Sequence, residues 1–166
     1  MMLPKVVRAG LQSGSIMSGA DITTQVVIEG KSAEDSSYDP YRTLRWAVAG
    51  ILLHGPYFYV GFSRLDQYFG PATSIGTVAK KTATAQFFLF PPYLVGIFSF
   101  MGFMEGCEDV TKKVAERVPE TFLSGCVFWP ISNSVNFALV PATLRVPYLA
   151  ASAGVWNSYL SWTNSK

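Results

Sequence analysis

The stretch FWPISNSVNFALVPATLR, residues 128–145, carries no charged side chain before its last residue, Arg145. It is mostly apolar, yet it holds two asparagines, two serines and two prolines. Apolar segments of this kind are typical of helices buried in a membrane or in a protein core, where amide and hydroxyl groups need hydrogen-bond partners. The stretch therefore predicts a helix inside a bundle, with polar groups directed at neighbouring helices or at a cavity.

Charge is also missing from three other parts of the chain. With His54 counted as neutral, the four uncharged stretches are 46–63, 82–104, 121–144 and 146–165. Each has the length of a membrane-spanning helix, roughly 17–25 residues. Only 14% of the chain is charged, whereas soluble domains average about a quarter. A fully buried helical core of a soluble protein is thus the less favoured alternative.

We predict one all-α domain, 1–166, that forms an integral membrane bundle of about four spanning helices. The expected helices cover about 4–29, 41–63 and 78–104, followed by the region 121–163. That last region is long enough for two spans or two unequal halves, and a split is expected at Pro141/Pro147. Polar loops are expected at 30–45 and 64–81. Pro56 and the pair Pro91–Pro92 should kink their helices.

The most charged part of the chain is 105–120. Val110, Val114 and Val118 recur there every four residues, which is typical of one helix face. This pattern predicts a short helix near 108–118 that lies in the membrane interface. A solvated loop is the alternative interpretation.

The first expected helix carries small and polar residues at helical spacing. Gly10, Gly14, Ser18, Asp21 and Gln25 follow one another at intervals of four, four, three and four. At about 100° per residue they fall on one narrow face. Small residues let helix backbones approach closely in lipid, and an aspartate there should face the bundle interior or water.

Several polar side chains are expected at membrane depth, and they are the candidate site residues. Asn133 and Asn136 are three apart and so share a helix face. Two interpretations stay open for the whole set: the groups bond to one another and lock the bundle, which the residues alone favour, or they line a water-filled pore. The candidate pore-lining or bundle-interior residues are Asp21, Gln25, His54, Gln86, Asn133 and Asn136.

The sequence offers no pattern for catalysis, metal binding or nucleic-acid binding. His54 is the single histidine and has no partner that completes a catalytic or metal motif. The net charge of +2 is too small to indicate nucleic acid. Cys126 lies in an apolar stretch, and we interpret it as a small apolar residue. We expect no enzyme activity, no cofactor and no metal. The basic N-terminus, free of acidic residues, is compatible with a mitochondrial address.

An ordered set of residues in the C-terminal half resembles a known family. The set is Trp129-Pro130, Asn136-Phe137, Val140-Pro141 and Arg145, followed by Trp156-Asn157-Ser158-Tyr159-Leu160-Ser161-Trp162. It is similar to the motif of the Mpv-seventeen family, also called the twenty-two-kilodalton peroxisomal membrane protein family. Weaker similarity upstream extends the resemblance over nearly the whole chain: Gly19, Asp21 and Gln25, then Gly55-Pro56 with Leu65-Asp66, then Gln86 and Pro91.

The chain also departs from the family pattern. Tyr59 and Gly61 stand where the family usually has a histidine and a tryptophan, and Ala85 stands where an aspartate is common. These changes remove polar groups from the bundle.

The resemblance implies a small protein with about four spanning helices, placed in the mitochondrial inner membrane or, alternatively, in the peroxisomal membrane. Family members are described as weakly selective channels that affect metabolite supply. We therefore expect a channel or metabolite-homeostasis factor whose partner is the lipid bilayer. The alternative is a non-conducting structural or assembly subunit, bound to other inner-membrane proteins or a larger respiratory-type complex. A homo-oligomer is compatible with either function.

Arg145 has two interpretations of its own. At a predicted helix break it is placed to contact an anion. It is also placed to anchor the chain at the interface, or to bind a backbone carbonyl that Pro141 or Pro147 leaves without a donor.

Overall fold

The computed structural model describes residues 4–32, 34 and 36–164, with side chains described as far as residue 158. Over this range the chain is helical and has no strand, which confirms the all-α prediction. The elements are α1 Lys5–Thr23, η1 Thr24–Ile28, α2 Pro40–Ala49, η2 Gly50–His54, α3 Gly55–Phe69, α4 Ile75–Thr84, η3 Ala85–Leu89, α5 Phe90–Met104, α6 Val110–Leu139, η4 Ala142–Leu144 and α7 Arg145–Asn164.

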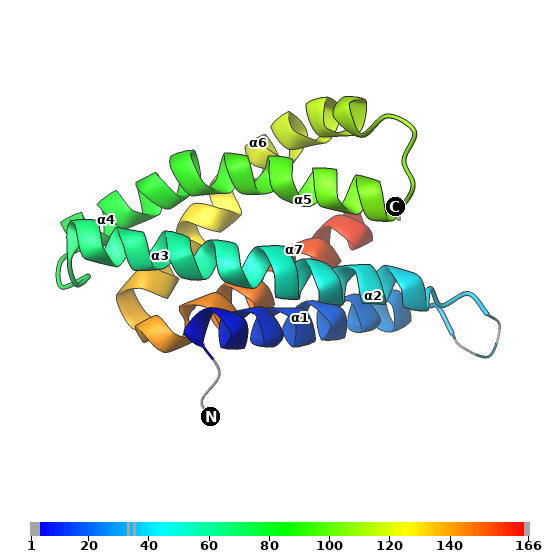
Figure 1. The fold of residues 1–166 in the computed structure, drawn as a ribbon, viewed down its shortest axis with the longest axis horizontal. Coiled ribbons are helices and arrows are strands. Elements are labelled where there is room, and N and C mark those ends of the chain that lie inside the picture. Colours follow the sequence, from blue (N-terminus) through cyan, green and yellow to red (C-terminus); the bar gives the residue numbers. More distant parts are fainter. Residues whose placement is uncertain (1–3, 33, 35, 165–166) are drawn as a thin grey trace.

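Several of these elements continue directly into one another and form five long helices. The first is α1–η1 (5–28), the second is α2–η2–α3 (40–69), and the third is α4–η3–α5 (75–104). The fourth and fifth are α6 and α7. The first long helix packs against the second and against α7, and α5 packs against α6. Figure 1 shows the first and second long helices side by side, with the third above them and α7 behind.

One described helix, Ile75–Met104, is long and apolar enough to cross a membrane by length and composition alone. The most apolar window of this helix has a mean hydropathy of 1.7 and is 33% buried. Asparagine, serine, proline or charged residues lower the hydropathy of the other long helices. The all-helical part of the prediction is therefore confirmed, whereas the count of about four spans stays a prediction.

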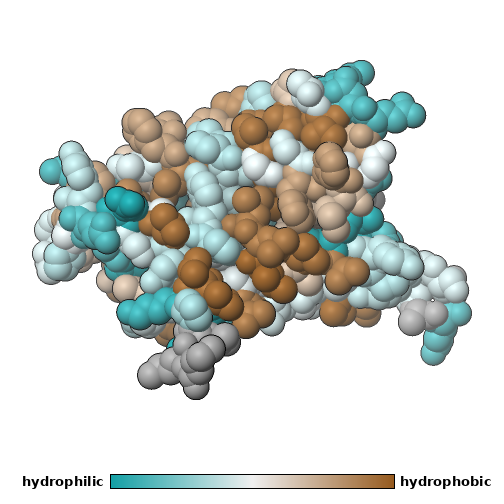
Figure 2. Space-filling view, in the orientation of Figure 1, coloured by the Kyte–Doolittle hydropathy of each residue, from teal (hydrophilic) through white to brown (hydrophobic). Residues whose placement is uncertain are grey.

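The outer surface of every long helix carries an apolar side chain that is 64–73% exposed. These side chains are Val27, Leu52, Phe88, Leu123 and Val155. Figure 2 shows apolar residues over much of one face of the molecule, with hydrophilic residues gathered toward its ends. A large exposed apolar surface marks a contact with lipid or protein, and this distribution is compatible with a bundle that lies in a bilayer.

Both predicted loops, 30–45 and 64–81, are too long. The second long helix begins at Pro40, where the Asp39 side chain accepts a hydrogen bond from the Arg42 N–H, and it continues to Phe69. Gly70 then adopts a φ of 71° and ends the helix. The third long helix starts at Ile75. The predicted helices were bounded by charged residues. Because a helix can continue through charged residues, the connections between the long helices are shorter than predicted.

The prediction of a separate short helix near 108–118 is wrong, because residues 110–118 are the start of the long helix α6. Asp109 caps α6 by accepting from the Lys112 N–H, and the helix continues through Pro119 and Pro130 to Leu139. Figure 1 shows α6 bending along its length. The predicted split is confirmed, since the chain leaves the α-helical path between α6 and α7.

Two π-helical turns precede the prolines that were expected to kink their helices. η2 ends directly before α3, which has Pro56 in its first turn. η3 ends directly before α5, which starts with Phe90 and Pro91–Pro92. A proline lacks the N–H that a regular helix needs, and a wider turn before it lets the chain stay helical. Such turns are frequent at functional sites.

The predicted small-residue face of the first helix is confirmed at its two glycines. A Cβ atom on Gly10 would lie 2.6 Å from the Ile51 carbonyl oxygen, and one on Gly50 would lie 2.5 Å from the Gly14 Cα. A Cβ atom on Gly55 would likewise lie 2.5 Å from the Gly10 Cα atom. Glycines on both sides therefore hold the first two long helices backbone to backbone, as in membrane helix pairs.

Candidate functional site

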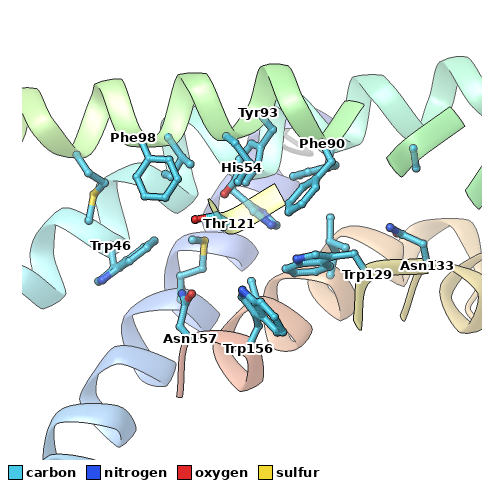
Figure 3. A pocket seen from close by; sticks show the side chains of 18 of the residues that line it. Trp46, His54, Phe90, Tyr93, Phe98, Thr121, Trp129, Asn133, Trp156 and Asn157 are labelled. Carbon is cyan, nitrogen blue, oxygen red and sulfur yellow. The ribbon is translucent and has the colours of Figure 1, made fainter. Parts of the chain in front are cut away.

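A cavity of about 250 Å³ lies inside the bundle and is lined by side chains from all five long helices. Its walls are mainly apolar, and seven of the lining residues are aromatic. Figure 3 shows Phe90 and Tyr93 of α5 on one side and Trp129 of α6 and Trp156 of α7 on the other. The ring centres of Phe90 and Trp129 are 5.4 Å apart, and those of the two tryptophans are 6.4 Å apart. An aromatic cavity with few polar groups is the usual form of a small-molecule site.

Three polar side chains stand out among the cavity walls. His54, only 1% exposed, has its Nδ1 atom 3.2 Å from the Ser13 Oγ atom. The Nε1 atom of Trp129 and the Oδ1 atom of Asn133 are buried and have no hydrogen-bond partner within the described part of the chain. Buried polar atoms without partners are rare in proteins. Two residues of α6 that line the cavity therefore carry one unused donor and one unused acceptor.

A second cavity of about 40 Å³ shares Met17, Trp46 and Asn157 with the first. Its other walls include Asp21 of α1 and Arg42 of α2. The two cavities therefore follow one another along the interior of the bundle, toward the end where the 29–39 connection lies.

Asp21 and Gln25 close that end through a bonded network. One Asp21 oxygen lies 2.7 Å from Arg42 Nε, and the other accepts from Gln25 Nε2 at 2.8 Å and from Thr43 Oγ1 at 2.7 Å. Gln25 also bonds both the N–H and the carbonyl of Asp39. Gln25 thus fixes the connection to the helices. We refer to Asp21, Gln25, Arg42 and Thr43 as the first cluster.

Asp39 marks the edge of this network, at the start of the second long helix. The N–H of Arg42 donates to its carboxylate at 2.9 Å, and this hydrogen bond lowers the pKa of the Asp39 carboxyl below its ordinary value of 3.8. The carboxylate is therefore charged at neutral pH, and it caps the helix N-terminus in its charged form.

The opposite end of the bundle holds a second cluster, made of Asp66, Lys81 and Arg145. Arg145 Nη1 lies 2.7 Å from both Asp66 oxygens, and Lys81 Nζ lies 2.6 Å from one of them. Lys81 is fully buried. Both cations also approach the ring of Phe137, at 5.9 and 5.4 Å from its centre. One carboxylate thus faces two buried cations.

Sequence reasoning did not foresee this second cluster. Asp66 and Arg145 are 79 positions apart, and no local pattern relates them. The Arg145 Nε–H donates to the Val140 carbonyl, which precedes Pro141, at 3.3 Å. Arg145 thus contacts a backbone carbonyl at this break, but its closer partner is the Asp66 carboxylate, which neither interpretation named.

The remaining predicted residues lie near the second half of the interior. Asn136 is fully buried and donates through Nδ2 to the Arg145 carbonyl at 3.3 Å, while its Oδ1 has no partner in the described residues. Gln86 lies 3.8 Å from Cys126 Sγ and lines neither cavity. Of the six candidates, His54 and Asn133 line the large cavity, and Asp21 lines the small one.

The motif residues occupy several roles in this arrangement. Trp129, Trp156 and Asn157 line the large cavity, Phe137 packs beneath the second cluster, and Val140-Pro141 forms the break before α7. Pro130 lies inside α6. The side chains of Tyr159, Leu160 and Ser161 fall outside the described residues.

No group of three histidine, cysteine, aspartate or glutamate residues within the described ranges is arranged to hold a metal ion. What the interior supplies instead is ring surface, carboxamides and one histidine.

An apolar outer surface, buried charges and an apolar interior cavity with aromatic side chains in its walls are typical of a helical membrane protein. The sequence model of the Mpv17 / PMP22 family matches residues 102–161. PXMP2/4 family protein 4 of Dictyostelium discoideum is 31% identical over 157 residues, which cover 93% of this chain and 80% of that protein. The chain therefore belongs to the Mpv17 / PMP22 family, and the resemblance read from its motifs is confirmed.

Two other relatives are similar over most of their length. Protein SYM1 of Gibberella zeae is 30% identical, with 91% of this chain and 85% of that protein covered. Mitochondrial inner membrane protein Mpv17 of Homo sapiens is 29% identical, with 92% and 86% covered. The name of this relative places it in the mitochondrial inner membrane, which confirms the location predicted for the chain. No solved structure matches the chain.

Proposed function

We propose that this chain is a weakly selective channel of the mitochondrial inner membrane, built on about four spanning helices. The observation that carries the proposal is the order of polar groups along the interior. This order begins at one end with the first cluster and the small cavity, and continues with the large cavity, where His54 and Asn133 lie. It ends with Asn136 and the second cluster at the other end. Such a sequence of groups through a bundle with an apolar exterior suits the passage of a small solute.

The arrangement corresponds to a closed channel. Asp21 and Arg42 close one end at 2.7 Å, and Asp66 and Arg145 close the other, also at 2.7 Å. Because both closures are ion pairs between different long helices, opening requires that these pairs separate. Passage is then controlled at the ends, while the cavity holds the solute between them. No catalytic step is part of the proposal.

The test is solute release from liposomes that contain the purified chain. Asp66→Asn weakens the closure of the second cluster, so we expect faster release of a small uncharged solute than from the unchanged chain. Glu120→Gln is the matched control, because the Glu120 side chain is 69% exposed and its ion pair is with Arg117, on the same helix. If neither the unchanged chain nor Asp66→Asn releases the solute, the channel is contradicted. If Asp66→Asn releases it at the same rate as the unchanged chain, the closure at Asp66 is contradicted.

A second candidate is a non-conducting assembly subunit of a larger inner-membrane complex. It is favoured by the same closed ends and by the bonds that Gln25 makes to the Asp39 backbone, which hold the interior shut. A native gel of mitochondria extracted in mild detergent tests it. Migration with a large complex supports the subunit, whereas migration as a monomer or small oligomer contradicts it.

A further inference from the structure

The large cavity has an interior that fits one class of molecule. We infer that it binds an uncharged, flat molecule of about two fused rings, whose polar edge carries an acceptor beside a donor. The inference rests on the proposed function, because it names the solute class that the cavity on the proposed path accepts. Most of the lining is apolar, and seven of the lining residues are Phe, Tyr or Trp.

The volume sets the size of the ligand. A dry cavity of about 150 Å³ holds benzene, and this cavity measures about 250 Å³. There is thus room for roughly one more fused ring. A lipid chain of ordinary length is far too long to be enclosed, although one end of it fits.

The walls select a flat ring. In Figure 3, Phe90 and Tyr93 lie on one side of the cavity and Trp129 and Trp156 lie on the other, so a ring bound in the cavity meets aromatic faces and edges. Offset and edge-to-face contacts between aromatic rings are favourable beyond the area that they bury. Met101 adds a thioether to the lining, which also contacts rings well.

The charges around the cavity argue for an uncharged ligand. Glu105 and Lys113, which reach its edge, form an ion pair with one another. His54 has Ser13 as a hydrogen-bond partner. A charged ligand would therefore enter an apolar space without a free counter-charge in the described lining, which is costly.

The polar edge of the ligand is defined by Trp129 and Asn133. They lie four positions apart on α6, so their side chains share one face of the helix. Both side chains are buried, at 7% and 6% exposure, and the Trp129 Nε1 and Asn133 Oδ1 atoms have no partner in the described structure. A ligand with a carbonyl next to an N–H group satisfies both atoms at once. A bound water does so too, but it leaves most of the cavity empty.

Calorimetric titration of the full chain in detergent tests the inference with three probes of one shape. 2-Quinolinone has a ring carbonyl beside a ring N–H. N-methyl-2-quinolinone lacks the donor, and naphthalene lacks both polar groups. We expect one-to-one binding of 2-quinolinone, with naphthalene weaker by roughly tenfold or more because each hydrogen bond in the site contributes a severalfold gain. The affinity for the N-methyl compound should lie between the affinities for the other two probes.

Variants assign the effect to the two side chains. Asn133→Leu should remove the preference for 2-quinolinone over its N-methyl form. Trp129→Phe should lower the affinity for both carbonyl compounds relative to the affinity for naphthalene. Glu120→Gln is the control, because Glu120 lies on the same helix, is exposed and does not line the cavity. It should keep all three affinities in their order.

The probe series alone decides the inference if a variant does not fold. Equal affinities for all three probes, or no saturable binding of any, overturn it. Its failure is separate from failure of the proposed function. Binding without solute release overturns the channel and leaves the site, whereas release without binding overturns the site and leaves the channel.

Discussion

The glycine contact between the first two long helices gives a quantitative prediction. In Gly10→Ala the new Cβ would lie 2.6 Å from the Ile51 carbonyl oxygen, about 0.8 Å short of the closest ordinary contact of 3.4 Å. The obstacle is backbone, so the helices themselves must separate. Overpacking of this kind costs about 1–3 kcal/mol, while alanine in place of glycine stabilises a helix by about 1 kcal/mol. We expect a net loss of stability in Gly10→Ala.

Gly19→Ala is the matched control in the same helix, since a Cβ there meets no atom within 4 Å. Both variants gain the same helix propensity, so the difference between them isolates the overpacking, about 1–3 kcal/mol. The assay is unfolding of the purified protein in mixed micelles, followed by circular dichroism. If Gly10→Ala unfolds at the same denaturant concentration as Gly19→Ala, the close contact between the two helices does not exist.

Three further predictions concern charged residues. Asp66→Asn leaves two buried cations without a carboxylate, and we expect it to destabilise the protein by about 2–3 kcal/mol, measured by the same unfolding assay. Asp21→Asn should loosen the first cluster, so that limited proteolysis cuts the 29–39 connection faster than in the unchanged chain; an equal rate would contradict its role. The Asp39 carboxyl has a lowered pKa, so its stabilising contribution is complete above pH 3.8 and is lost below it. The melting temperature should therefore fall below that pH, less steeply in Asp39→Asn.

Local patterns in the sequence predicted the helices and one of their contacts. The spacing of Gly10 and Gly14 identified the face that packs on the second long helix, because small residues at helical spacing have a direct steric consequence. The break around Pro141 was also readable, since proline restricts the residue before it. The length of α6 could not be predicted in this way, because the charged stretch 105–120 was separated from the uncharged region that follows, whereas one helix includes parts of both.

The interior could be predicted only in part. The polar residues were recognised as inward-facing, and Asp21, His54 and Asn133 do line the two cavities. Which partner each one meets depends on how the helices pack, and the sequence carries no local signal for that. The second cluster shows this most clearly: Asp66 and Arg145 are 79 residues apart and join the second long helix to α7.

The two buried cations beside Asp66 have an electrical consequence. These cations lie at the end of the molecule where α1, α4 and α7 begin and α3 ends (Figure 1). Six basic residues lie at this end, together with one acidic residue, Asp66. These basic residues are Lys5, Arg8, Arg64, Lys80, Lys81 and Arg145. A transmembrane voltage acts on each charge with about 2.3 kcal/mol per 100 mV. In an energised membrane, the voltage therefore favours the orientation that places this end on the negative side.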